Sequence, residues 1–251
     1  MAGHSKWANI KHKKGKADAA RGKVFSKIAK EIMVAASHGG GNPDDNIQLR
    51  ALIQKAKSVS MPKDNIERSI KKGTGELEGG RLEEGSYEGY APGGVAIVVK
   101  VLTDNKNRSA SEVRHAFNKA GANLAEQGSV SRMFQRKGQI FVDKKIIGEE
   151  NLMECILEAD IDDLKLHESQ YEILCETAHY DKVSDLLIRS KIDIASSGIV
   201  MIPDIITEVV DLGQATSLLK FIEALEDLDD VQDVYANFDI SDEVVRILEN
   251  E

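Results

Sequence analysis

The sequence predicts an α+β protein in which a basic three-helix domain precedes two ferredoxin-like domains, one inserted into the other. Three observations predict this class. Helical periodicity fills the first 75 residues, a segment rich in glycine and acidic residues follows, and strands then alternate with helices to the C-terminus. A chain of 251 residues is also longer than a usual single domain, so two or three domains are expected.

Three helices are expected in the N-terminal part. Apolar residues recur at helical spacing across residues 24–36, and glycines after His38 end this helix. Asn42 is expected to cap a second helix, which has a proline in its first turn and runs to about Ser58. A third helix is expected over residues 62–73, where two lysines and a glycine mark its end.

The next segment begins the α+β part of the chain. Residues 73–85 lack periodicity and are expected to form a linker, and residues 87–94 are expected to form a turn. A nearly continuous apolar run predicts a strand over residues 95–103. Ser109 is then expected to cap a helix, and residues 129–134 to form a second strand.

A complete β-α-β-β-α-β series follows, which is the ferredoxin-like order. Its expected strands are 139–142, 164–168, 171–175 and 192–201, with helices through 152–157 and 183–188. A strand at 205–210, a helix through 218–225 and a strand at 231–238 supply the β-α-β half that the earlier unit lacks, and a short helix at 242–248 ends the chain. The predicted domains are therefore residues 1–75, residues 76–135 with 204–240, the inserted residues 136–203, and a C-terminal helix over 241–251.

The formal net charge of −9 conceals an uneven distribution of charge. Residues 1–75 hold 16 Lys and Arg against 6 Asp and Glu, whereas the remainder holds 17 against 36. The N-terminal part thus carries +10 and the rest −19. A cationic segment binds phosphate by displacing condensed counterions, and an acidic body limits which face a polyanion approaches.

The first thirty residues form the candidate nucleic-acid-binding segment. Trp7, the only tryptophan, lies inside the basic run with no apolar periodicity around it, and an indole can stack on an unpaired base. The alternatives are a solvated lysine-rich tail and a Trp7 that packs within its own domain. The candidate binding residues are Lys6, Trp7, Lys11, His12, Lys13, Lys14, Lys16, Arg21, Lys23 and Lys27. Tyr87 and Tyr90 as stacking rings, and Lys106 and Arg108 as phosphate contacts, are weaker candidates.

Other classes of function have little support in the sequence. No apolar run reaches the roughly 20 residues that cross a bilayer, and we interpret the N-terminus as mature cytoplasmic protein. Cys155 and Cys175 lack zinc-ligand spacing, and we interpret them as buried free thiols. No P-loop, dinucleotide fingerprint, HExxH or catalytic triad is present. We therefore expect no enzyme, cofactor, metal or small-molecule substrate.

Several segments resemble the YebC/PmpR family. The resemblance lies in residues 1–14, 22–27, 61–66, 103–108 and 112–117, and it extends over nearly the whole chain. It implies a three-helix N-terminal domain with two α+β domains, which agrees with the pattern described above. Arg132 stands where the family has a tryptophan.

The resemblance also implies a function in gene expression. Members are described as bacterial DNA-binding transcriptional regulators, and a mitochondrial relative is similar to a translational activator of cytochrome c oxidase. The expected partner is therefore nucleic acid, either DNA or ribosomal or messenger RNA, with the ribosome or another protein on the acidic domains. A basic arm without a helix-turn-helix suits structured RNA at least as well as duplex DNA, so both remain open.

Overall fold

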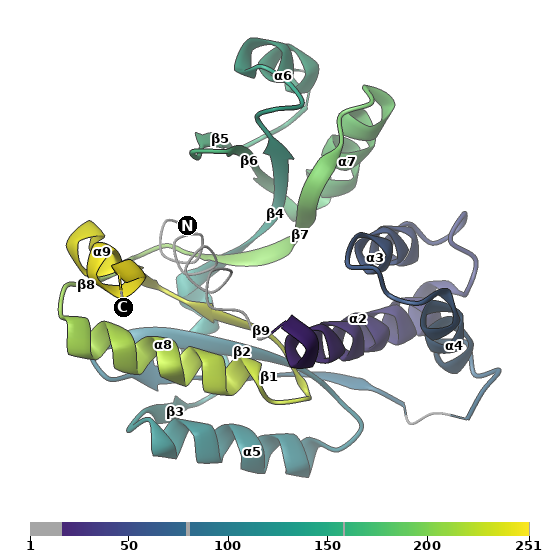
Figure 1. Ribbon diagram of the computed structural model, residues 1–251. Helices are drawn as coiled ribbons and strands as arrows, with labels where there is room; N and C mark the ends of the chain where they lie inside the picture. The colour runs from purple at the N-terminus through teal and green to yellow at the C-terminus, as the bar shows by residue number, and fades with distance from the viewer. Residues whose placement is uncertain (1–16, 79–80, 158, 251) are drawn as a thin grey trace. The chain divides into compact units, whose positions relative to one another are not determined.

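The computed structural model describes residues 17–78, 81–157 and 159–250 and confirms the predicted α+β class (Figure 1). The chain divides into two compact units. Unit 1 is the chain up to Arg132 together with Ile205–Glu251, and unit 2 is Met133–Asp204. No helix in the described ranges is long and apolar enough to cross a membrane.

Three helices begin unit 1, as predicted. They are α2 (Ala17–Gly39), α3 (Ile47–Ser58) and α4 (Lys63–Gly73). Their apolar faces meet in one cluster, in which Ile32, Leu49 and Ala56 are fully buried. Burial of the shared cluster stabilises helices of this length, which are marginal in isolation.

The second helix begins later than predicted, because Asn46 and not Asn42 is its cap. The Asn46 side-chain oxygen accepts the Leu49 N–H at 3.0 Å, and its amide nitrogen donates to the Ala35 carbonyl at 2.9 Å. Asn46 is buried and thus satisfies backbone groups of α2 and α3 together. Asn42 instead accepts the Asp44 N–H within the preceding turn.

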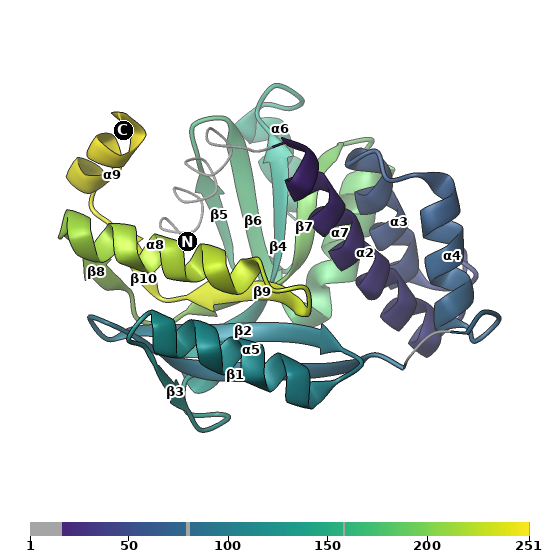
Figure 2. The same ribbon diagram turned by 60° about the horizontal axis from the view of Figure 1, so that its bottom comes forward.

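An antiparallel sheet with the order β3-β1-β2-β9 forms the centre of unit 1. Its strands are β1 (Glu83–Ala91), β2 (Val95–Thr103), β3 (Asn123–Ala125) and β9 (Val231–Ala236). Helices α5 (Lys106–Lys119) and α8 (Leu212–Glu226) cover one face of the sheet (Figure 2). Phe117 of α5 and Phe221 of α8 meet edge to face. A parallel pair, β8 (Thr207–Val209) with β10 (Phe238–Ile240), and α9 (Asp242–Asn250) complete the unit.

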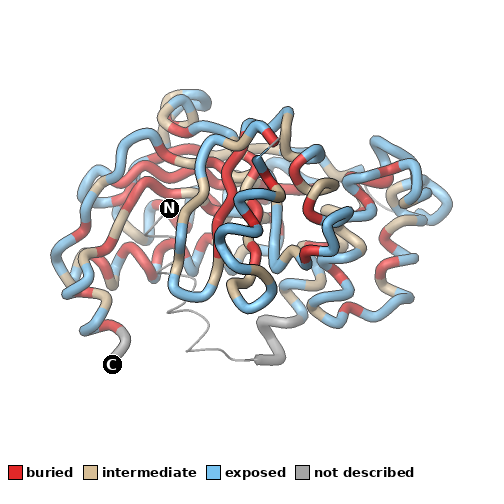
Figure 3. The backbone as a smooth tube through the Cα atoms, turned by 90° about the horizontal axis from the view of Figure 1, so that it is seen from above, coloured by how far each residue is buried: buried red, intermediate tan, exposed pale blue. Residues whose placement is uncertain are grey.

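Strand β2 has the bounds that the sequence predicts, because its apolar run is buried. Eight of its nine residues are buried, and Figure 3 shows long buried runs of this kind in red. The predicted turn over 87–94 is wrong, since residues up to Ala91 belong to β1 and the turn is confined to residues 92–94. Gly93 and Gly94 have φ values of +86° and +77°, which explains the glycines there.

Two further predictions in unit 1 are wrong. Asn105 caps α5, and Ser109 lies within the helix, where its hydroxyl bonds Asp230 at 2.7 Å. Residues 129–134 do not form a strand of this sheet, because residues 127–130 are a turn and Ser131–Met133 a 3-10 helix. Strand β1 lies between β2 and β3 in the sheet, and β8 pairs with β10.

Unit 2 has the strand order β5-β6-β4-β7, antiparallel throughout, which is the order of a ferredoxin-like sheet. Its elements are β4 (Phe134–Asp143), α6 (Glu149–Ile156), β5 (Asp163–Leu166), β6 (Gln170–Glu176), α7 (Tyr180–Arg189) and β7 (Ile194–Pro203). Ile140, Ile173, Leu152 and Leu187 from both layers are fully buried in its core.

Candidate nucleic-acid interface

Most of the predicted binding segment lies outside the described residues. Lys6, Trp7, Lys11, His12, Lys13, Lys14 and Lys16 all precede residue 17. Arg21 lies within α2, and the side chains of Lys23 and Lys27 are described on the same helix. The assignment of the N-terminal residues to nucleic-acid binding stays a prediction.

Lys23, Lys27 and Lys30 share one face of α2, because they are four and three residues apart. This face lies against the turn between α8 and β9. Lys23 forms an ion pair with Asp227 at 2.7 Å, and Lys27 donates to the backbone carbonyl of Gln232 at 3.3 Å. The structure therefore brings these lysines together against an acidic segment of the same unit.

Lys30, which is not among the candidate residues, makes the most extensive of these contacts. Its Nζ donates to Asp230 Oδ1 at 2.8 Å and to the backbone carbonyls of Asp229 and Leu102 at 2.8 and 3.3 Å. These partners are 72 to 200 residues distant in sequence. Lys30 thus fastens α2 to the α+β part of unit 1.

Asp230 is the centre of this junction. Its side chain is 3% exposed, and it accepts from Lys30, from Arg108 Nη2 at 2.8 Å and from the hydroxyls of Ser109 and Thr103 at 2.7 and 3.0 Å. Burial alone would raise the pKa of this carboxyl, but the four donors hold the pKa well below its usual range. Asp230 is consequently ionised at neutral pH and binds both cations.

The weaker candidates beside this junction are also engaged in contacts within unit 1. Arg108 bonds Asp104 as well as Asp230, and Lys106 forms an ion pair with Glu83. Tyr87 is half-buried and donates to the Lys106 carbonyl at 3.3 Å. Burial raises the pKa of the Tyr87 phenol, with a smaller contribution from Asp230. These groups hold β1, β2 and α5 together.

A second set of cations lies on α4 and faces solvent. Arg68, Lys71 and Lys72 are exposed and lie three and four residues apart, so they share one side of the helix. Within the described part of the chain, none of the three makes an ion pair or a side-chain hydrogen bond. We term these three residues the α4 basic face. By contrast, Lys55 and Lys63 are paired with Glu31 and Glu67.

A buried carboxylate organises the turn that follows β3. Glu88 is 3% exposed, and its oxygens accept the backbone N–H groups of Gly128, Val130 and Ser131 at 2.7 to 2.9 Å. Burial opposes ionisation, but the three N–H groups outweigh it and lower the pKa of Glu88. This contact explains why residues 127–130 form a turn and not the predicted strand.

The sequence missed Asp230, Lys30 and the α4 basic face for different reasons. Asp230 is one of two adjacent acids that resemble a solvated turn, and no local pattern links it to Lys30. Lys71 and Lys72 are recognisable in sequence as a basic last turn, which is also favourable to the helix dipole. Only the helical spacing to Arg68 indicates a shared face.

Comparison with known proteins places this arrangement in a family. The profile described as TACO1/YebC protein N-terminal domain matches residues 5–76, and the one described as TACO1/YebC second and third domain matches residues 82–238. The chain belongs to the TACO1/YebC family. The resemblance found in the sequence is thus confirmed.

Relatives of similar length support the same membership of the TACO1/YebC family. Proteins from Geobacter sulfurreducens and Syntrophus aciditrophicus, both named probable transcriptional regulatory proteins, are 53% and 51% identical. Each alignment covers 99% of this chain, with 100% and 99% of the relative. The crystal structure of a conserved hypothetical protein from Aquifex aeolicus is 47% identical, with a TM-score of 0.84 over 93% of this chain and 96% of that one.

Proposed function

We propose that this chain is a non-enzymatic, cytoplasmic regulator of gene expression that binds nucleic acid through its N-terminal basic part. The division of charge carries the proposal: residues 1–75 hold 16 Lys and Arg against 6 acids, and the rest holds 17 against 36. A phosphate backbone is attracted to the first part and repelled by the second. The relatives named probable transcriptional regulatory proteins support a role in transcription. The polymer that we propose for this role is duplex DNA.

Within the residues that the structure describes, the α4 basic face supplies cations for contact with phosphate. Arg68, Lys71 and Lys72 have no carboxylate partner within the described residues, so phosphate binding breaks no ion pair there. Lys23 and Lys30 differ, because a phosphate would have to displace Asp227 and Asp230. The α4 face therefore contributes to binding beside the predicted residues 6–16, and the lysines of α2 hold unit 1 together.

The dependence of the affinity for duplex DNA on salt concentration tests the role of the α4 basic face. The double variant Arg68→Gln/Lys71→Gln is compared with Lys119→Gln/Lys220→Gln, which removes the same charge from exposed positions of α5 and α8. Each phosphate contact contributes about 0.9 to the slope of log affinity against log salt, so the α4 variant lowers the slope by about 2. Equal slopes in both variants would exclude the face from the interface.

The alternative function is that of a ribosome- or RNA-binding translation factor. A basic domain of three helices without a helix-turn-helix favours it, since structured RNA offers phosphates and unpaired bases. Cross-linking in cells, followed by identification of the adducts, separates the two. Chromosomal DNA supports the transcriptional function, whereas ribosomal or messenger RNA without DNA refutes it in favour of translation.

A further inference from the structure

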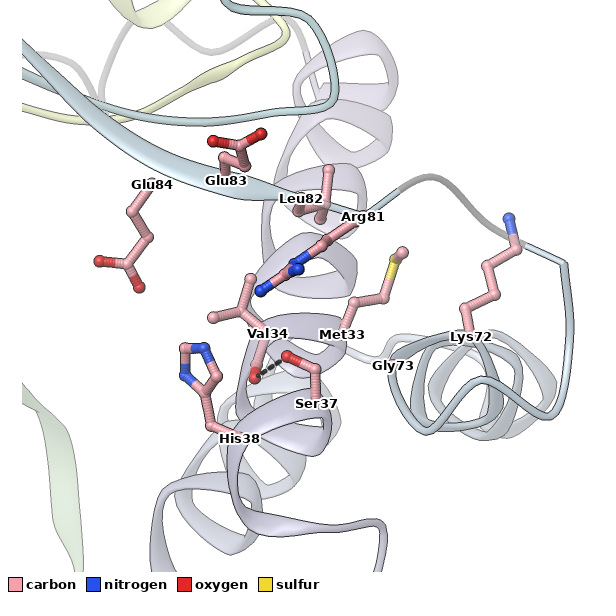
Figure 4. A pocket seen from close by; sticks show the side chains of 10 residues that line it. All are labelled: Met33, Val34, Ser37, His38, Lys72, Gly73, Arg81, Leu82, Glu83 and Glu84. Atoms are coloured by element: carbon pink, nitrogen blue, oxygen red, sulfur yellow. Dashed lines mark hydrogen bonds between the residues drawn. The ribbon is translucent and has the colours of Figure 1, made fainter.

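A hollow of about 770 Å³ lies in unit 1 where the C-terminal parts of α2 and α4 meet the start of β1 (Figure 4). Such a volume is within the roughly 300–1,000 Å³ range of ligand sites. Neither the charge distribution nor the ion-paired junction around Asp230 accounts for it. Its lining combines apolar, cationic and carboxylate side chains.

Glycine sets the shape of this hollow. A Cβ atom on Gly73 would lie 2.3 Å from the backbone oxygen of Met33, so α4 can end against α2 only with glycine there. This close approach places the last turn of α4 beside residues 33–38 of α2. The wall is therefore built from two packed helices of one hydrophobic cluster.

One wall of the hollow is apolar. It is formed by Met33 and Val34 of α2 and by Leu82, which directly precedes β1, and Val34 is 8% exposed. A methionine thioether makes favourable contacts with aromatic rings, and its flexible chain adapts to their shape. The wall suits one flat aromatic ring.

Two cations flank that wall. Lys72 projects from α4 on one side of Met33, and Arg81 and the His38 imidazole lie on the other side (Figure 4). All three are exposed, and no side chain of the three makes a hydrogen bond or ion pair with another residue in the described ranges. The neighbouring Glu83 carboxylate is ion-paired with Lys106, and Lys106, with a smaller contribution from Arg81, lowers the pKa of Glu83. An arginine and a lysine so placed bind phosphate oxygens.

Acceptors complete the lining. Glu84 has no partner among the residues that the structure describes, and the Ser37 oxygen retains acceptor capacity although its hydroxyl donates to the Val34 carbonyl. Carboxylate and hydroxyl oxygens accept N–H groups from the edge of a nucleobase. In a duplex the Watson–Crick edge of each base is already paired, so that edge is free only where the base is unpaired.

We propose that this hollow binds a single unpaired nucleotide of a nucleic acid. The base lies on Met33, Val34 and Leu82, and the phosphates on either side meet Lys72 and Arg81. This inference rests on the proposed function, because it names the part of the polymer that enters the protein. It requires a bulge, loop or single-stranded end in the preferred target.

Two labelled DNA hairpins test this inference, one fully paired and one with a single bulged nucleotide. Wild-type protein should bind the bulged form more tightly by about tenfold, the scale of stacking one base on a protein side chain. Arg81→Gln and Met33→Ala should each reduce this preference severalfold, the second without any change in charge. Lys119→Gln, which removes one exposed charge from α5, should preserve it.

The outcomes separate this inference from the proposed function. Equal affinity of the wild type for both hairpins would overturn the nucleotide site and leave the proposed function standing. A preference that persists in both Arg81→Gln and Met33→Ala would also overturn it, provided that circular dichroism shows both variants folded. Absence of binding to either hairpin, and to the corresponding RNA hairpins, would refute the proposed function itself.

Discussion

Replacement of Asp230 by Asn should loosen the attachment of α2 to the rest of unit 1. The carboxylate is 3% exposed and binds Lys30 and Arg108, each at 2.8 Å. Loss of one partner from a buried ion pair costs about 3–5 kcal/mol. Because the Lys30 and Arg108 side chains are 21% and 45% exposed, they can turn toward water, and we expect the lower end, about 3 kcal/mol.

Urea unfolding and amide hydrogen exchange of α2 measure this effect. Asp227→Asn is the matched control, because it removes a carboxylate from the same turn. Asp227 is ion-paired with Lys23, but the two side chains are 61% and 43% exposed, respectively. Exposed pairs contribute about 0–1 kcal/mol, so the control should unfold almost like the wild type. Equal costs for the two variants, or unchanged exchange in α2, would refute the role of Asp230.

The low pKa of Asp230 predicts that the folding stability of the protein depends on pH. The pKa of Asp230 is lower in the folded chain than its value of about 3.9 in an unfolded one. Its contribution is therefore complete above the unfolded pKa and is lost as the pH falls through the folded pKa. Asp230→Asn should show a smaller loss of stability on acidification than the wild type.

Other predictions concern single positions. Glu88→Gln should destabilise unit 1 by about 2 kcal/mol and speed amide exchange in residues 128–131, since a charged acceptor of three N–H groups is lost. Gly73→Ala should lower the melting temperature because its Cβ meets a backbone oxygen at 2.3 Å, whereas Gly22→Ala, which meets nothing within 4 Å, should raise it. Burial raises the pKa of the Cys175 thiol to about 11, so alkylation at pH 8 should modify half-buried Cys155 first.

Much of the fold follows from local sequence patterns. The run over Val95–Thr103 predicts β2 with its observed bounds, because buried strands are apolar at every position. Strand β1 could not be recognised in this way, since it contains Gly85 and Gly89. A Cβ on Gly89 would lie 2.3 Å from the Asn123 oxygen, so this glycine reflects close contact with β3 and not a turn.

The candidate site was less predictable, because its contacts join distant segments. The charge division indicates where a polyanion binds, but it cannot distinguish lysines that face solvent from lysines that face carboxylates. Lys30 and Asp230 are 200 residues apart in sequence. Ser109 resembles a helix cap in sequence, but its hydroxyl donates a hydrogen bond to the same Asp230 carboxylate. Only the packing of α2 on the α8–β9 turn shows which lysines and hydroxyls bind this carboxylate.

The two ends of unit 2 lie side by side, since Phe134 at the start of β4 pairs with Pro203 at the end of β7. Backbone atoms close the same point, where the Asp204 N–H donates to the Met133 carbonyl at 2.9 Å. Paired residues of antiparallel strands have Cα atoms about 5 Å apart, a gap that a short turn spans. We therefore expect that a short turn can replace unit 2 and join the chain on either side, and that another domain whose ends are adjacent can be inserted at the same position.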